Sequence, residues 1–268
     1  MLLQRARGIF YKTFGDIGMS ARLIRLVTLV FMLAGCATAP RVKPVDARAP
    51  VASAAKITLL PVGVPARPEV SVIHSTGVTL GLVGTLVDGV RFNAHEKALA
   101  ACLQQQQFDY QATIAGGIKS ALEADGYRIE EIGGSPPTVE RANWLTPLPE
   151  LKSSEYLLDV VFDYFGYAAD WDSKPYLPAV AMKAQLTDRS GKQRFFTRII
   201  YNPALGLFQK SNGPKIPADE RYAFGSMADI KTDPAKAAQG LEAAVQSVLD
   251  ELRRELDTRA APEVAESD

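Results

Sequence analysis

The residues that most often carry chemistry are sparse in this chain, and they form no catalytic pattern. The two histidines, His74 and His95, show no His-x-x-His or Glu-x-x-His spacing, so each is expected to be a surface or capping residue. Asp159 and Asp163 share one face of an expected strand, about 13 Å apart, which is too far for a catalytic carboxylate pair. The sequence holds neither a Gly-x-Ser-x-Gly elbow nor a phosphate-binding loop. We therefore predict no catalytic residue, no metal, no cofactor and no enzymatic activity.

Acidic and aromatic residues gather around one expected turn and are the remaining candidates for a binding site. Asp163, Asp170 and Asp172 could meet near a strand end and bind a cation, or they could form a solvated charged rim. Exposed aromatic side chains at a sheet end often anchor a partner, and the alternative is a small core of their own. The aromatic residues in question are Tyr164, Phe165, Tyr167, Trp171 and Tyr176.

The chain has two cysteines, Cys36 and Cys102. Cys102 lies in a helix-like run, residues 98–103, and is expected to be a small buried hydrophobic side chain. An intermolecular disulfide or a reactive thiol is the alternative for this residue.

The segment before Cys36 has the layout of a bacterial signal peptide. Arg22 and Arg25 precede a short apolar stretch, residues 26–33, which is far below the roughly 20 residues of a spanning helix. The run Leu-Ala-Gly-Cys that ends at Cys36 resembles the lipobox of bacterial lipoproteins. That resemblance implies cleavage between Gly35 and Cys36 and attachment of diacylglyceryl and a further acyl chain, such as palmitate, to Cys36.

The residues around this motif refine the expectation. Met19 is a better start for such a signal, so residues 1–18 are expected to be an upstream-start artefact within the signal peptide, residues 1–35. By resemblance to enteric-type lipoproteins, Ala37 favours the outer membrane over the inner membrane. Residues 36–54 then supply the lipidated cysteine and a flexible tether rich in proline and alanine. Three acyl chains would hold the protein firmly on its bilayer, facing the periplasm.

The composition is that of an ordinary globular protein, with 47% hydrophobic and 22% charged residues. Residues 1–35 contain five basic residues and one acidic residue, so 25 basic and 29 acidic residues remain beyond them, a formal charge of −4. A mildly acidic domain is a poor partner for nucleic acid, which favours clustered lysine and arginine.

Hydrophobic periodicity predicts two long helices. In residues 108–125, Ile114, Ile118 and Leu122 recur at helical spacing. Residues 234–256 carry a second apolar stripe, which begins behind Asp233 as a cap.

Alternating apolar residues predict strands over residues 56–62, 69–73, 127–132, 156–167, 179–187 and 193–201. The last three form an antiparallel meander with a hairpin turn at residues 188–192. Within residues 156–167, one face is expected to carry Leu158, Val160, Phe162 and Tyr164, and the other face Asp159 and Asp163.

These elements predict an α+β fold: a two-layer sandwich with a mixed or antiparallel sheet and two main helices packed on one face. A single domain is expected over residues 55–256, followed by a disordered acidic tail, residues 257–268. The order of strands and helices from Lys56 to the last helix resembles the TolB amino-terminal and CsgG-like domains and the ABC-transport auxiliary lipoproteins. The resemblance rests on the layout alone.

Residues 77–90 do not belong to that layout. Four glycines, Gly77, Gly81, Gly84 and Gly89, lie among aliphatic residues. Glycine permits close backbone approach, so one hypothesis is a hairpin that touches a membrane or forms oligomers. The alternative is a buried loop or short helix packed on the domain.

Three functional hypotheses follow. The first is a non-enzymatic adaptor or accessory subunit of an envelope transport or secretion assembly, with envelope protein partners or a homo-oligomer beside the lipid bilayer. The second is an envelope small-ligand binder or hydrolase that uses the region from Asp163 to Tyr176. The third is a pore-forming oligomer that uses residues 77–90.

Overall fold

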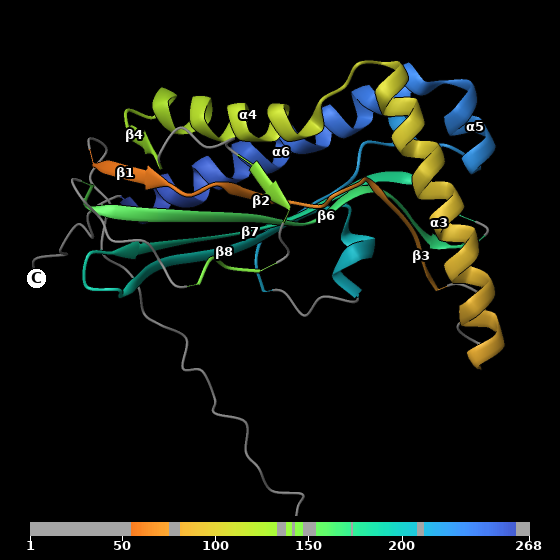
Figure 1. Ribbon diagram of the computed structural model, residues 1–268, viewed down its shortest axis with the longest axis horizontal. Helices are drawn as coiled ribbons and strands as arrows, with labels where there is room; N and C mark the ends of the chain where they lie inside the picture. The colour runs from red at the N-terminus through yellow and green to blue at the C-terminus, as the bar shows by residue number, and fades with distance from the viewer. Residues whose placement is uncertain are drawn as a thin grey trace, which may run out of the picture. The chain divides into compact units, whose positions relative to one another are not determined.

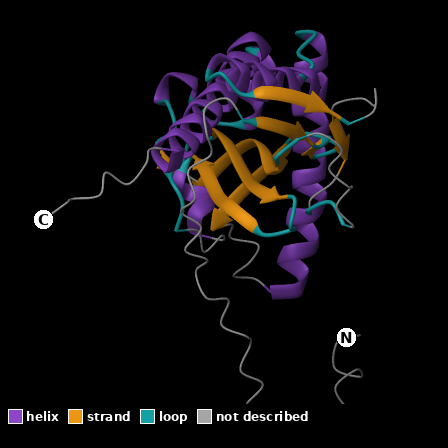
Figure 2. Ribbon diagram, turned by 90° about the vertical axis from the view of Figure 1, so that its left-hand side faces the viewer, coloured by secondary structure: helices purple, strands orange, loops and turns teal. Residues whose placement is uncertain are grey.

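The computed structural model describes residues 55–74, 81–132, 138–140, 143–146, 154–172, 174–207 and 212–260 (Figure 1). All of them belong to one compact unit, Asp46–Asp268. The signal segment, Cys36, most of the tether, Gly77 and residues 261–268 lie outside the described residues. The predicted α+β class is confirmed, because a mixed sheet carries helices on one face (Figures 1 and 2).

The described strands form one sheet with the order β4-β1-β6-β7-β8-β9. On one side of β6, the strands β4 and β1 run parallel to it, and on the other side β7 and β8 form the predicted antiparallel meander. These strands are β4 (Arg128–Glu131), β1 (Lys56–Leu59), β6 (Tyr156–Trp171), β7 (Leu177–Asp188), β8 (Gln193–Tyr201) and β9 (Lys215–Ile216).

The first predicted strand is divided. Pro61 has no N–H to donate, and the chain leaves β1 before it and continues as β2 (Val62–Val64). Further along β6, the strand β3 (Glu69–His74) pairs in parallel with its second half, and β5 (Thr138–Glu140) pairs with β2. The sheet is therefore widened by three short parallel strands that follow the length of β6.

Because β6 contains a β-bulge, its side chains do not alternate between the two faces of the sheet as predicted. Leu158, Val160 and Phe162 point into the core as expected, but the register against β7 shifts between Phe162 and Tyr164. One extra residue at that point reverses the alternation. Tyr164 therefore lies in a small cluster on the opposite face, and Phe165 takes the core position.

Both predicted main helices are present on one face of the sheet: α4 (Tyr110–Ala124) and α6 (Pro234–Ala260). Asp109 caps α4 by accepting a 3.0 Å hydrogen bond from the amide of Ala112, and Asp233 caps α6 in the same way through Lys236. Since α6 runs to Ala260, the first four residues of the expected tail are helical. The two helices α4 and α6 pack on the core mainly through Ile114, Ile118, Leu122, Leu241, Val245, Val248, Leu249 and Leu252.

A third long helix, α3 (Gly81–Gln105), replaces the hairpin, loop or short helix expected around residues 77–90. Its carboxyl-terminal half packs on the core through Leu99, Cys102 and Leu103. Cys102 is buried as expected, and its Sγ lies 3.8 Å from the carbonyl oxygen of Ile230. No helix among the described residues is long and apolar enough to span a membrane.

Candidate functional site

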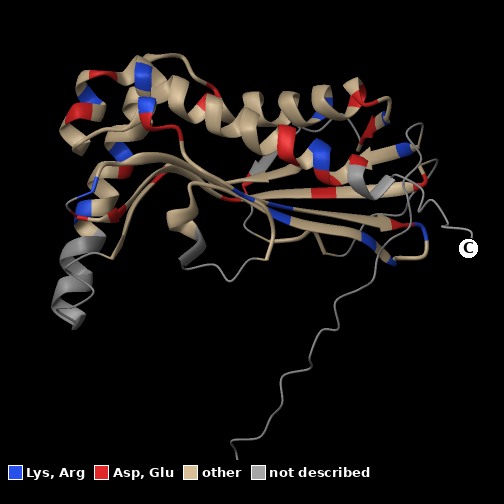
Figure 3. Cartoon of the chain, turned by 180° about the vertical axis from the view of Figure 1, so that it is seen from behind, with Lys and Arg blue, Asp and Glu red and all other residues tan. Residues whose placement is uncertain are grey.

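The three aspartates proposed as a cation site do not meet. Asp163 pairs with Lys183 at 2.9 Å and Arg198 at 2.6 Å, and Asp172 pairs with Arg91 at 2.8 Å. Asp170 lies 3.8 Å from the imidazole of His74. Across the described part of the chain, no three His, Cys, Asp or Glu side chains gather as a metal would require, and both signs of charge are interspersed (Figure 3). These three aspartates therefore do not form a shared cluster.

Asp159, on the face of β6 opposite to Leu158 and Val160, is fully buried. Its Oδ2 accepts a 2.9 Å hydrogen bond from the amide of Leu145. The segment of residues 143–146 thus lies against β6 and takes Asp159 away from solvent, which a strand pattern alone does not reveal.

The aromatic residues divide between the core and the surface. Tyr164, Tyr167 and Tyr176 are buried, so their expected exposure is wrong. They do not form a core of their own either, because Tyr167 and Tyr176 belong to the main core and Tyr164 to the small cluster on the opposite face. The Tyr164 hydroxyl donates to the carbonyl of Tyr167 at 2.9 Å, and the Tyr167 hydroxyl donates to Ala237 at 3.1 Å. Burial raises the pKa of both phenols, which keeps them neutral. Trp171 is 49% exposed and remains the only one of the four candidate aromatic contact residues on the described surface.

The remaining candidate residues lie apart from these. Gly81, Gly84 and Gly89 fall within the amino-terminal half of α3. His74, at the end of β3, is exposed and stacks on Trp171 with ring centroids 4.4 Å apart. His95, on α3, lies edge-on to Phe92, and burial, with help from nearby Arg91 and Lys231, lowers the pKa of His95.

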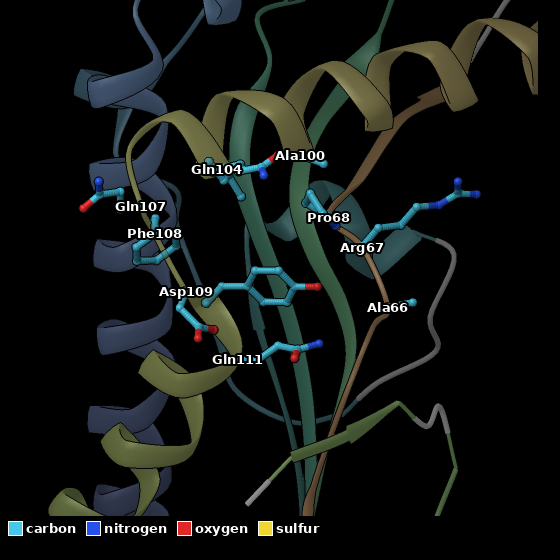
Figure 4. Close-up of a pocket in the computed structure, with 11 residues that line it drawn as sticks. Ala66, Arg67, Pro68, Ala100, Gln104, Gln107, Phe108, Asp109 and Gln111 are labelled. Atoms are coloured by element: carbon cyan, nitrogen blue, oxygen red, sulfur yellow. The ribbon is translucent and has the colours of Figure 1, made fainter. Parts of the chain in front are cut away.

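Two neighbouring hollows, which the sequence did not predict, flank the connection between β2 and β3 at Ala66 and Arg67. The first, of about 470 Å³, opens between this connection, the end of α3 and the start of α4 (Figure 4). The Tyr110 hydroxyl donates to the carbonyl of Pro65 at 2.9 Å, and the Tyr110 ring stacks on Phe165. The polar residues that line the first hollow include three glutamines and are Arg67, Gln104, Gln107, Asp109, Tyr110 and Gln111.

The second hollow, of about 390 Å³, is acidic. Four carboxylates from four elements line it, with Arg67 as the cation at its rim: Glu69 from β3, Glu96 from α3, Glu140 from β5 and Asp163 from the bulge of β6. Arg67 lies 3.1 Å from Glu96, and Asp163 has its two cations on the sheet.

Glu69 has the most altered acidity in this hollow. Burial, together with the nearby Glu96 carboxylate, raises the pKa of Glu69 from its ordinary value to about 7, and Arg67 opposes this rise. The hollow can therefore take up or release a proton near neutral pH. Together the two hollows offer amide groups on one side of Arg67 and carboxyl groups, two of them paired with cations, on the other, a setting that suits a polar group.

Sequence reasoning missed this region because its residues are far apart in the chain. Glu69 and Asp163 are brought together by the parallel pairing of β3 with β6, in which Glu69 lies opposite Gly166. Asp163 lies at the bulge, where the register of β6 against β7 shifts. The only local sign is the strand-breaking Pro-Ala-Arg-Pro run between the two strands.

Comparisons with known proteins find distant likenesses only. No protein-family model matches the chain. A search of curated proteins finds no match either. Among solved structures, protein XCC0632 of Xanthomonas campestris, with the family model DUF330, matches at 12% identity and a TM-score of 0.38 over 80% of this chain and 88% of that one.

Two further structures are similarly remote. Lipoprotein GNA1162 of Neisseria meningitidis matches at 14% identity and a TM-score of 0.29, over 55% of this chain and 81% of that one. A PelC dodecamer from Paraburkholderia phytofirmans matches at 11% identity and a TM-score of 0.29, over 76% of this chain and 91% of that one. At such values the likenesses assign no function, and the proposals below rest on the residues of this chain.

Proposed function

We propose that the protein is a lipoprotein of the bacterial envelope, anchored through acylated Cys36 and facing the periplasm. One observation carries this proposal: the apolar segment ends in the Leu-Ala-Gly-Cys run, and a proline-rich stretch separates it from a domain whose first described residue is Ala55. A signal, a modified cysteine, a tether and a folded domain follow in the order that lipid anchoring requires.

The domain itself acts as a non-enzymatic adaptor or accessory subunit of an envelope transport or secretion assembly. The hollows around Arg67 support this role, because a charged, partly exposed side chain lies between two neighbouring hollows whose linings combine apolar, amide and carboxyl groups. Such a surface can receive a polar segment of a partner protein and orient it by charge.

Metabolic labelling tests the anchor. A palmitate analogue should label the wild type and the Cys102→Ser variant equally, because Cys102 is buried, and should leave Cys36→Ser unlabelled. After fractionation, the labelled proteins should be found in the membrane fraction and the unlabelled Cys36→Ser variant should not. Labelling that persists in Cys36→Ser, or a wild type that is unlabelled and soluble, contradicts the proposal.

Affinity capture from detergent-solubilised envelopes tests the adaptor role. We expect a defined set of envelope proteins to co-purify with the tagged wild type and with Lys192→Glu, a charge reversal in the exposed hairpin turn. Arg67→Glu should lose them, because it places a carboxylate beside the four already in the acidic hollow. Capture of the same proteins by Arg67→Glu contradicts a role for this site.

The second candidate function is a small-ligand binder. The region from Asp163 to Tyr176 does not form the site that was expected, but Asp163 lines the acidic hollow, and the volumes of the two hollows suit a small molecule. A binder of this kind would gain thermal stability from a cationic compound in the wild type and not in Glu96→Gln.

A further inference from the structure

The amino-terminal half of α3 extends beyond the ends of β3 and β6 (Figures 1 and 2). Its 25 residues give a length of about 37 Å. Leu99 is fully buried, whereas Val90 is 75% exposed, the highest value among the large exposed hydrophobic residues described. Nine residues separate the two, which places Val90 half a turn around the helix from Leu99. Val90 therefore lies on the side of α3 that faces away from the core.

The chemistry of residues 81–90 continues this apolar character. Their sequence contains five aliphatic residues and one charge, Asp88. Val90 itself faces away from the core, where a soluble helix would normally carry a polar residue.

Trp171 joins Val90 at this end of the molecule. Arg91, the next residue after Val90, donates a 2.8 Å hydrogen bond to Asp172, the next residue after Trp171. Trp171 in turn stacks on His74 at the end of β3. We call Val90, Arg91, His74 and Trp171 the α3–Trp171 surface.

This surface has the composition of a membrane interface. Tryptophan has an apolar body and a polar N–H and is enriched where lipid headgroups meet acyl chains. Of the two carboxylates in the region, Asp172 is paired with Arg91, and Asp170 lies 3.8 Å from the His74 imidazole. Contact with lipid would therefore depend on apolar burial more than on attraction between charges.

The tether is long enough for such contact. Nineteen residue steps from Cys36 to Ala55 span at most roughly 65 Å when extended. The start of β1 lies beside the start of β6, since Ile57 pairs with Tyr156, and Trp171 ends that strand about 50 Å away. A bilayer that holds Cys36 is therefore within reach of the far end of the sheet.

We propose that the α3–Trp171 surface rests on the bilayer, with the amino-terminal half of α3 in the boundary between headgroups and acyl chains. The proposal deepens the proposed function, on which it rests for the choice of a bilayer as the occupant. It gives the anchored domain a fixed orientation, with the hollows around Arg67 held at a defined height above the lipid.

Tryptophan fluorescence tests this contact in the acylated protein, because the chain has only two tryptophans, Trp144 and Trp171. In vesicles of phosphatidylethanolamine and phosphatidylglycerol with brominated acyl chains, Trp144→Phe leaves Trp171 as the reporter, and its emission should be quenched. Trp171→Phe leaves Trp144, which packs against Phe196 and Lys183 on the sheet, and its emission should be unaffected. Equal emission of Trp171 in brominated and ordinary vesicles overturns the proposal.

A second measurement separates this proposal from the lipid anchor. The chain from residue 36 onward with Cys36→Ser lacks the signal segment and keeps the whole unit Asp46–Asp268. We expect it to co-sediment with the same vesicles, with little dependence on salt. Val90→Asp should lower the bound fraction about tenfold, and Ile132→Asp, at an exposed residue next to β4, should not.

The outcomes are distinguishable. Vesicle binding that depends on Val90 supports the surface even if Cys36 is not acylated. Acylated protein without quenching of Trp171 leaves the anchor in place and overturns the surface. The Val90→Cys variant could also form disulfide-linked dimers equally well with and without vesicles. That result would show that a second copy of the chain covers α3, and it would also overturn the proposal.

Discussion

At the scale of single residues, Glu69 makes stability depend on pH. Its pKa is about 7 in the folded protein, where burial and Glu96 oppose ionisation, against 4.5 for an ordinary glutamate. Between these values the native state holds a proton that the unfolded chain has released, so the free energy of unfolding falls as pH rises from about 4.5 to 7 and then levels off. Allowing for its partial exposure, the loss should be on the order of 2 kcal/mol.

Glu69→Gln removes this titration, and urea unfolding at several pH values measures the change. The variant should lose the decline between pH 4.5 and 7 and should exceed the wild type in stability near pH 8. Glu123→Gln, at an exposed position of α4, serves as the matched control and should follow the wild type. An unchanged decline in Glu69→Gln would show that another group titrates.

At the scale of the elements, α3 ends in a motif that normally contains glycine. Phe108 donates to the carbonyl of Leu103 and Gln107 to that of Gln104, both at 3.0 Å, which is the Schellman pattern. Gln107 occupies the left-handed position, with φ at 52°. Gln107→Gly should therefore raise the free energy of unfolding by about 1 kcal/mol, measured by chemical denaturation.

Gln107 also lines the first hollow, which gives the same variant a second use. If its side chain contacts a partner, Gln107→Gly should weaken capture of that partner while stabilising the domain. A variant that is less stable than the wild type would contradict the conformational argument.

The pairing of β3 with β6 depends on Gly166. A methyl group added there would lie 1.8 Å from the carbonyl oxygen of Glu69, which is backbone and cannot rotate away. Gly166→Ala should therefore separate the two strands and lower the melting temperature by roughly 10 °C or more, as expected for a loss of several kcal/mol. Gly116→Ala is the control, since nothing lies within 4 Å of its added methyl group, and it should be neutral or slightly stabilising.

At the scale of the whole molecule, the sequence predicts the fold class, both main helices and the meander, because these depend on local periodicity and on caps such as Asp109. The sequence does not predict α3, because the first half of this helix consists mainly of glycines and aliphatic residues, which give no amphipathic pattern. The site is less predictable still. Glu69, Glu96 and Asp163 are assembled by parallel strand pairing and a bulge, neither of which has a local pattern. The resemblance to TolB amino-terminal and CsgG-like domains remains a prediction.

The position of β1 in the middle of the parallel half of the sheet has a kinetic consequence. Ile57 must pair with Tyr156, about a hundred positions later in the chain, whereas β6, β7 and β8 pair with neighbours across short turns. Long-range pairing has a high loop-closure cost, so we expect the meander to form first and β1 to join late. Until then the earliest-synthesised strand of the domain is an unpaired apolar segment held close to the proposed anchor, where it is open to aggregation and to capture by chaperones.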